Sequence, residues 1–192
     1  MYLLTETASP FALERWAAFF ANFGQFAKGF FYTLGISIGA LIVALLLGLI
    51  FGAMSSTHNK VLRGISRVYV EIFQNTPLLV QFVVVFYGIS ILTDGHVMIP
   101  ISLTAILCVG VYTGAYISEI IRTGIEAVPK GQTEAALSQG FTYADTMRII
   151  ILPQAVRTIL PPLTNQVVNL IKNTSTVAII SGADIMFTAK AW

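Results

Sequence analysis

The chain has 192 residues, of which 56% are hydrophobic and only 10% are charged, and its mean hydropathy is +0.79. A water-soluble domain uses about a quarter of its residues as charged side chains to cover its surface, whereas a bilayer penalises charge. The composition therefore excludes an ordinary soluble domain and predicts an all-α bundle of helices that spans a membrane many times. The net charge of +2 is too small to indicate a nucleic-acid partner.

The first residues lack the basic start and the single apolar run of a cleaved signal peptide. Phe11, Trp16, Phe19 and Phe20, together with Glu14 and Arg15, are typical of an amphipathic segment at the membrane surface. A disordered terminus is the alternative. We assign residues 1–27 to an external or interfacial segment and residues 28–192 to the transmembrane domain.

Four apolar stretches reach the roughly 20 residues that a helix needs to cross a bilayer. They are residues 29–54, 72–92, 98–117 and 147–171. The short loops on one side carry the positive charge, as Lys60, Arg63, Arg67, Arg122, Lys130 and Arg148, whereas the loop around Asp94 has none. Because positive residues stay on the cytoplasmic side, the pattern places the N-terminus outside.

Small and reactive residues suggest packing rather than chemistry. Glycines four apart, such as Gly48 with Gly52 and Gly110 with Gly114, let helix backbones approach closely. The single cysteine, Cys108, lies in an apolar stretch and offers neither a disulfide nor a thiolate metal site. No glycine-rich loop ending in Gly-Lys-Ser or Gly-Lys-Thr occurs, so we predict no ATP site of that kind in this chain. We also predict no catalytic residue, no metal and no cofactor.

The loop between the third and fourth apolar stretches has the sequence of a short helix. Residues 132–139 are good helix formers, Gly140 suits the left-handed conformation that ends a helix, and Thr142 with Asp145 forms a capping pair. A helix of two turns is not stable alone in water, so we expect it to dock on a partner through Ala135, Ala136 and Leu137. The alternative is a helix that rests on its own bundle.

This loop carries a family signature. Glu134-Ala135-Ala136, then Gly140, then Ile150 and Leu152-Pro153 resemble the signature loop of ABC importer permeases. The resemblance implies a bundle of the type I ABC importer permease kind with a cytoplasmic coupling helix at about 131–140. It also implies which residues couple the permease to the ATPase, namely Gly131, Glu134, Ala135, Ala136, Leu137 and Gly140.

Other segments are similar to one branch of that family, the permeases for polar amino acids. The likeness extends over residues 73–81, 116–122, 152–157 and 172–175, although Gln74 replaces the usual arginine. It implies two ATPase subunits, a second permease copy or a homologous permease, an extracytoplasmic amino-acid-binding protein, membrane lipid and a bacterial inner membrane. Family members usually have five spans, so we expect a shortened chain whose fifth span is absent after 192.

The last span carries a polar stripe. Gln154, Thr158, Asn165, Asn169 and Lys172 share one face of a helix, and Gln166 lies beside them. Such residues normally face a bundle interior or a water-filled path, so we predict that they line the substrate pathway, with helix-to-helix hydrogen bonding as the alternative. Pro153 with the prolines at 161 and 162 should kink the helix, as in many transport sites.

Glu119 and Arg122 have the spacing of an ion pair, and we assign them with Pro153 and Arg157 to gating or structure. The polar stripe holds amides and a lysine but no carboxylate, which favours glutamine or glutamate over basic amino acids as the substrate. Two alternatives remain, a carrier driven by an ion gradient and a membrane scaffold that transports nothing.

Overall fold

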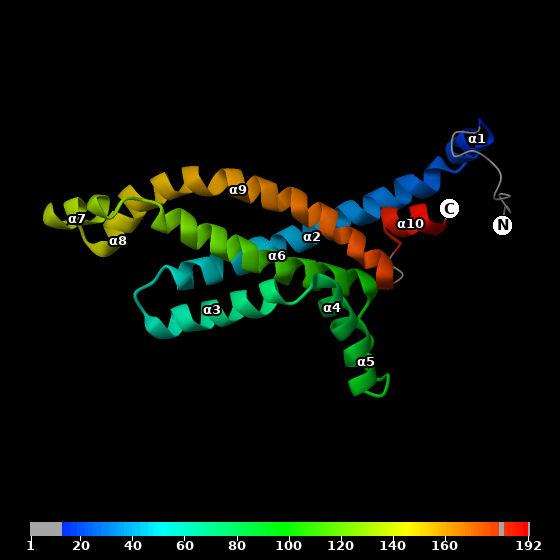
Figure 1. Cartoon of the computed structure of the whole chain (residues 1–192), viewed down its shortest axis with the longest axis horizontal. Coiled ribbons are helices and arrows are strands. Elements are labelled where there is room, and N and C mark those ends of the chain that lie inside the picture. The colour runs from blue at the N-terminus through cyan, green and yellow to red at the C-terminus, as the bar shows by residue number, and fades with distance from the viewer. Residues whose placement is uncertain (1–12, 181–182, 192) are drawn as a thin grey trace.

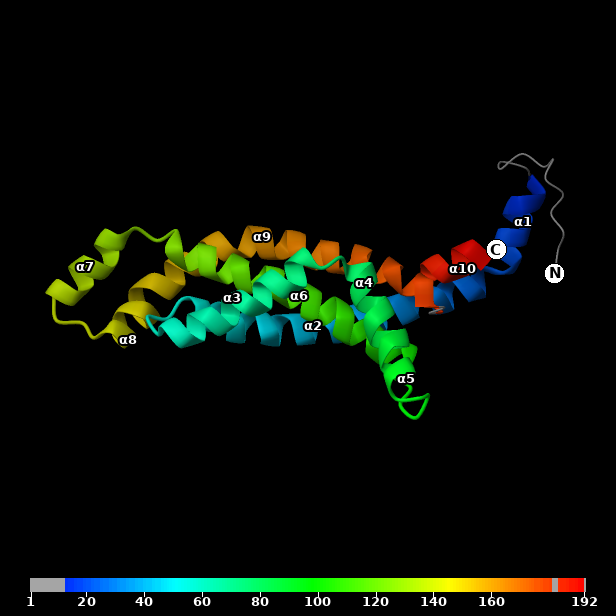
Figure 2. The same cartoon turned by 60° about the horizontal axis from the view of Figure 1, so that its bottom comes forward.

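The computed structural model describes residues 13–180 and 183–191. Three long helices, α2 (Phe23–Ser55), α6 (Ile101–Glu126) and α9 (Leu152–Asn173), run side by side along the long axis (Figures 1 and 2). In these two ranges every regular element is helical and no strand occurs. The predicted all-α bundle is confirmed.

Shorter elements surround these helices. They are α1 (Leu13–Ala21), α3 (Lys60–Asn75), α4 (Leu78–Val83), α5 (Ile89–Leu92), α7 (Lys130–Ser138), α8 (Tyr143–Asp145) and α10 (Ile185–Ala191), with π-helical turns η1 (Val84–Gly88) and η2 (Thr146–Ile151) and the 3₁₀ segment η3 (Thr174–Ile180). α3 packs against α2 and α6, and Figure 1 shows α6 lying between α3 and α9. α7 and α8 close the end opposite α1 and α10.

The tightest contact joins α2 to α6, because small residues line it. Ala40 and Ala44 are fully buried there. A Cβ atom added at Gly48 would lie 2.4 Å from the Ile117 Cγ2 atom, and one at Gly110 would lie 2.8 Å from the Val43 Cβ atom. The expected close approach of helices at these glycines is confirmed.

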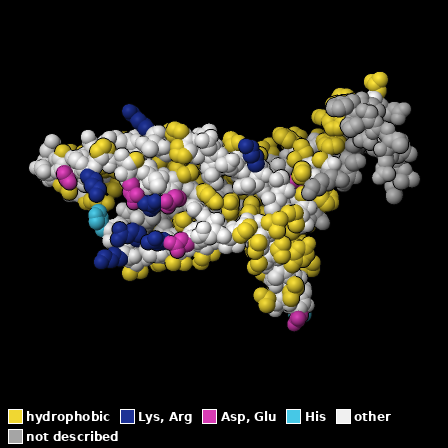
Figure 3. Space-filling model, viewed as in Figure 1, with side chains coloured by type: hydrophobic (Ala, Val, Ile, Leu, Met, Phe, Trp, Pro, Cys, Tyr) yellow, Lys and Arg dark blue, Asp and Glu magenta, His cyan; other side chains and the backbone are white. Residues whose placement is uncertain are grey.

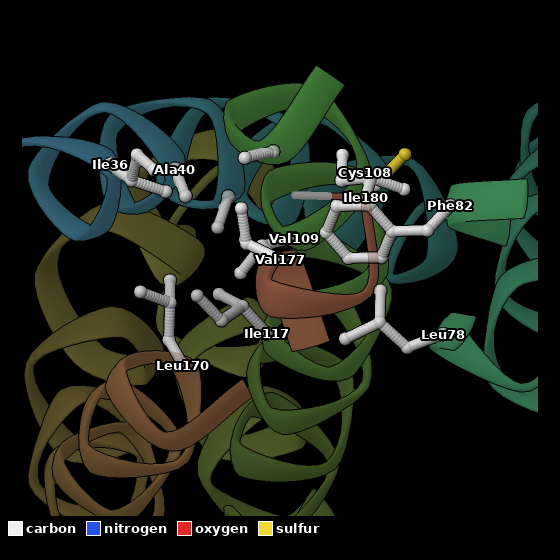
Figure 4. Close-up of a cluster of buried hydrophobic side chains, with 12 residues drawn as sticks. Ile36, Ala40, Leu78, Phe82, Cys108, Val109, Ile117, Leu170, Val177 and Ile180 are labelled. Carbon is white, nitrogen blue, oxygen red and sulfur yellow. The ribbon is translucent and has the colours of Figure 1, made fainter. Parts of the chain in front are cut away.

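One apolar cluster ties the remaining elements to this pair (Figure 4). Ile36 from α2 and Val109 from α6 meet Phe82 from α4, Leu170 from α9 and Val177 from η3. Phe82 and Val109 have no exposed surface. Cys108 is also buried in this cluster, as the sequence predicted, so it acts as a small hydrophobic side chain.

The expected continuous span over 72–92 is wrong. α3 ends at Asn75, Thr76 is extended, and the helix resumes after Pro77 at an angle of 97°. The residue before a proline disfavours the helical conformation, which explains the break. The Gln81 side chain donates to the carbonyls of Phe73 (3.1 Å) and Thr76 (3.0 Å), so buried Gln81 satisfies the backbone that the break frees.

Four spans were expected, but fewer helices among the described residues are long and apolar enough to cross a membrane. Only α2 and α6 are long and apolar enough to cross a membrane alone, and the bent pair of α3 with α4 to α5 makes a third if it counts as one span. α9 is long enough but does not reach the same apolar threshold, because its polar stripe and its two charged residues interrupt it. What covers α9 therefore needs a separate explanation.

The N-terminal segment is helical from Leu13. Trp16 and Phe19 meet edge to face with ring centroids 6.2 Å apart, and Phe19 also contacts Phe26 of α2. Residues 1–12, the side chains of Glu14 and Arg15, and anything after Ala191 lie outside the described residues. The interfacial position of the segment stays a prediction.

Candidate functional site

The polar stripe on α9 faces outward from this chain. Its members Gln154, Thr158, Asn165, Asn169 and Lys172 are all exposed. A different face of the same helix is buried, with Ala155 at 0% exposure and Leu170 at 1%. Gln166 is only 9% exposed and lies on this inner face, so the structure separates it from the five others.

These exposed side chains have almost no partners within the described residues. Gln154 donates to the carbonyl of Ile150 at 2.9 Å, but Thr158, Asn165, Asn169 and Lys172 make no side-chain hydrogen bond there. Polar groups placed against hydrocarbon cost several kcal/mol each by order of magnitude. The stripe therefore has to meet water, another protein or a ligand.

The expected kink of α9 is milder than a break. The helix runs unbroken from Leu152 to Asn173 through Pro161 and Pro162, and it bends gently in Figure 1. Proline has no backbone N–H, so the carbonyl groups of residues 157 and 158, one turn earlier, lose the hydrogen-bond donors that they would otherwise have. Pro153 lies in the first turn of α9, directly after the π-helical turn η2.

The predicted short helix is confirmed as α7, and it ends as the sequence indicated. Gly140 has φ +87°, its N–H donates to the Leu137 carbonyl at 3.0 Å, and the Phe141 N–H donates to the Ala136 carbonyl at 3.1 Å. These two bonds form a Schellman motif, which positive φ at glycine permits. The Thr142 hydroxyl then accepts from the Asp145 N–H at 3.2 Å and starts the next helix.

α7 presents two different faces. Ala136 is 3% exposed and packs inward, where α7 rests on η2, whereas Leu137 is 47% exposed. Glu134 and Ala135 are exposed with Leu137, and the space around Gly131 is open. The helix therefore rests on its own bundle through one side and has an exposed face on the other, and docking of that face on a partner stays a prediction.

A recess of 680 Å³ lies beside this helix. It is lined by the α2 to α3 loop, the end of α6, α7 and η2, and includes Lys130 and Glu134. The His58 and Tyr143 rings meet edge to face across it, with centroids 5.1 Å apart. The loop between α2 and α3 is thus in contact with the segment that follows α7.

The predicted ion pair on α6 is present, and it includes a second carboxylate that the sequence analysis did not name. The Arg122 Nε atom donates to Glu119 at 3.0 Å, and an Arg122 Nη atom donates to Glu126 at 2.5 Å. The sequence reasoning missed Glu126, although its spacing of four from Arg122 is the same kind of signal. Arg157 is exposed on α9 and has no ion pair with any described residue.

Charged side chains gather at the α7 end of the molecule, whereas the middle and the limb formed by α4 and α5 are largely apolar on the face seen in Figure 3. The described residues contain no group of three metal-binding side chains. Asp184, also missed, is fully buried and accepts a hydrogen bond of 2.9 Å from the Phe187 N–H. An aspartate just before an apolar helix is the capping signal that would have found it.

Comparisons with known proteins agree with this architecture. The profile of the binding-protein-dependent transport system inner membrane component family matches residues 44–191. The probable glutamine ABC transporter permease protein GlnM of Bacillus subtilis (strain 168) is 41% identical over 173 residues, which cover 88% of this chain and 77% of the relative. The glutamate/aspartate import permease protein GltJ of Escherichia coli (strain K12) is 35% identical over 187 residues, covering 88% and 76%.

Solved structures place the fold. A chain from the crystal structure of an amino acid ABC transporter with histidines superposes with a TM-score of 0.84 at 33% identity, covering 91% of this chain and 80% of that one. An inward-facing MetNI methionine ABC transporter gives a TM-score of 0.68 at 18% identity, covering 85% and 77%, and supports the fold alone. The chain therefore belongs to the family of inner membrane components of binding-protein-dependent transport systems, as an ABC importer permease for amino acids.

Proposed function

We propose that this permease forms one wall of the path along which an ATP-driven importer carries a polar amino acid by alternating access. The observation that carries the proposal is the exposed stripe of α9, where Asn165, Asn169 and Lys172 have no partner within the described residues. Amide groups and an ammonium group in a membrane bundle favour a polar path over lipid contact. Lys172 suits the carboxylate of an amino acid.

The stripe needs a cover, and a second permease is the cover that fits best. Two copies, or this chain and a homologous one, would place two such faces opposite each other and enclose a polar path between them. Gln166 lies on the buried face and supports the wall from behind. Arg157, Glu119 and Arg122 lie nearer the α7 end, where we assign them to gating or structure.

α7 is the proposed link to the energy source. Its outward residues, Glu134, Ala135 and Leu137, would enter a groove on a separate ATPase subunit, while Ala136 and the Gly140 turn hold the helix on η2. Two ATPase subunits would then rock the pair of permeases between states open to either side. The α7 end is cytoplasmic in this arrangement, and the N-terminus and an amino-acid-binding protein lie outside.

Glutamine or glutamate is the favoured substrate. The α9 stripe contains no carboxylate, so the cationic side chain of arginine or lysine would find no counter-charge on it. Burying an uncompensated charge costs more than burying an amide that can hydrogen-bond to Asn165 or Asn169. The names of the glutamine and glutamate/aspartate relatives point in the same direction.

Reconstitution tests the proposal against an ion-gradient carrier. Proteoliposomes would contain this chain, its partner permease and the ATPase subunits, with ATP inside and the binding protein outside. We expect labelled glutamine to enter only with hydrolysable ATP, and excess arginine to compete poorly. Uptake driven by a sodium or proton gradient without the ATPase would favour the carrier, and full uptake by an Asn169→Leu variant would favour the scaffold.

A further inference from the structure

A cleft of 420 Å³ opens between the end of α2, α3 and the last turns of α6. Six charged side chains line it, Arg63, Arg67 and Glu71 on α3 and Glu119, Arg122 and Glu126 on α6. Figure 3 shows charged side chains of both signs facing one another between these two helices. The cleft is separate from the α9 stripe, because α6 lies between α3 and α9 (Figure 1).

Ion pairs occupy two of the three guanidinium groups. Arg67 donates to Glu71 at 2.9 Å, and Arg122 is held by both Glu119 and Glu126. Arg63 makes no hydrogen bond or ion pair through its side chain with any residue of 13–180 or 183–191. One cation in the wall of the cleft is therefore open to a ligand.

The neutral polar side chains of the cleft are already in use. The Ser55 hydroxyl donates to the Gly52 carbonyl at 2.7 Å, and the Ser66 hydroxyl donates to the Phe51 carbonyl at 2.7 Å. The Gln74 amide donates to the Ala115 carbonyl at 3.2 Å. A ligand entering the cleft would thus be recognised by its charged walls.

The balance of charge selects the ligand class. A free guanidinium binds a carboxylate through two parallel hydrogen bonds. Glu126 is 58% exposed and pairs through one oxygen, so it retains acceptor sites for an ammonium group. Three arginines and three glutamates sum to zero, which favours a neutral ligand that carries both charges, and the volume lies within the range of about 300–1,000 Å³ typical of small-molecule sites.

We infer that this cleft binds a free α-amino acid as its zwitterion, with the carboxylate on Arg63 and the ammonium group on Glu126. The assignment of the cleft to the cytoplasmic side of the membrane rests on the proposed function, which makes the α7 end cytoplasmic. A ligand held by both α3 and α6 ties these helices together, so substrate that accumulates inside slows its own import. The cleft is a product-sensing site distinct from the transport path.

The test uses the complete transporter in proteoliposomes with ATP and rising concentrations of glutamine inside. We expect uptake of external labelled glutamine to fall as internal glutamine rises. Arg63→Gln should raise the internal concentration that halves uptake by about tenfold, since a hydrogen bond to a charged group is lost. Lys60→Gln removes a charge from the same helix outside the cleft and should keep wild-type inhibition, and the external KM should be equal in all three.

Two analogues test the need for both charges. Internal glutaminamide lacks the carboxylate, and internal N-acetylglutamine lacks the ammonium group, so neither should inhibit. Inhibition by either analogue as strong as that by glutamine would overturn the assignment of the zwitterion.

Equilibrium binding makes the inference independent of transport. Labelled glutamine binding to the complex in nanodiscs, without the binding protein, should lose one component in both Arg63→Gln and Glu126→Gln. If ATP drives no uptake at all, the proposed function fails while this binding still decides the inference. The inference is overturned, with the proposed function intact, if binding is unchanged in both variants and internal glutamine does not slow uptake. It is also overturned if phosphatidylethanolamine in the nanodiscs abolishes the Arg63-dependent binding of glutamine, because the cleft would then hold a lipid headgroup.

Discussion

The α2 to α6 contact and the outer face of α9 are both helix surfaces in one bundle, yet they are completed in opposite ways. The first is closed by the chain itself, with Ala40 and Ala44 fully buried and glycines that leave no room for a Cβ atom. The second keeps four polar side chains without a partner in the described residues. The chain therefore derives stability from the first surface, and we expect function at the second.

The largest effect is expected from a substitution that disrupts the α2 to α6 contact. Gly48→Ala places a Cβ atom 2.4 Å from the Ile117 side chain, so we expect a loss of about 1–3 kcal/mol in the free energy of unfolding. Gly35→Ala is the matched control on the same helix, because nothing lies within 4 Å of its added Cβ atom. Thermal unfolding of the two purified variants measures the difference. Equal unfolding midpoints would show that the α2 to α6 contact does not depend on a glycine at position 48.

The open surface should respond in activity rather than in stability. Asn169→Leu or Lys172→Met removes a polar group from the proposed path, and we expect uptake to fall about tenfold while the yield of folded protein stays normal. Val168→Leu changes an exposed apolar neighbour and serves as the control. Unaltered uptake in both polar variants would mean that the stripe lines no path and only packs against another helix, as the scaffold alternative expects.

A smaller effect is expected where α7 turns into α8. Gly140→Ala forces a side chain into φ +87°, at a cost of about 1–2 kcal/mol that the chain relieves by shifting α7. ATPase activity stimulated by the loaded binding protein should drop several-fold, since the outward face of α7 is displaced. Gly35→Ala, which adds a Cβ atom in open space on α2 and outside the proposed coupling residues, should leave the stimulation unchanged.

The smallest effect concerns the charged cleft. Glu126→Gln removes one of two carboxylates that hold Arg122, and Glu126 is 58% exposed, so the free energy of unfolding should fall by less than about 1 kcal/mol. Urea or thermal unfolding checks this value. A much larger loss would assign the cleft to structure, in contrast with the ligand role inferred for it.

Local signals predicted the α7 region well. The helix formers of 132–139, the glycine at 140 and the pair Thr142 with Asp145 act over a few residues, and each appears in the structure as expected. The Glu119 to Arg122 pair followed from spacing in the same way. Such features depend on the neighbouring turn and need no knowledge of the tertiary fold.

Features that depend on distant contacts were harder to predict. The break at Pro77 is signalled locally and is supported by Gln81 from within the same segment, but its angle of 97° is formed where α3 and α4 both pack against α6. Gln166 shares the polarity of the α9 stripe, yet its position turns it into the bundle, where it is 9% exposed. The charged cleft joins residues of α3 and α6 that are distant in the sequence, such as Arg63 and Glu126, and no spacing rule connects them.

One labelling experiment tests the central claim that the α9 stripe lines a path governed by ATP. In a Cys108→Ser background, Asn165→Cys and Val168→Cys variants of the reconstituted transporter are exposed to a membrane-impermeant thiol reagent with and without ATP and vanadate. We predict modification of the Asn165→Cys variant at a rate that changes with nucleotide, slows with glutamine and stops uptake, while the Val168→Cys variant reacts little. Equal, slow and nucleotide-independent rates at both positions would contradict the account.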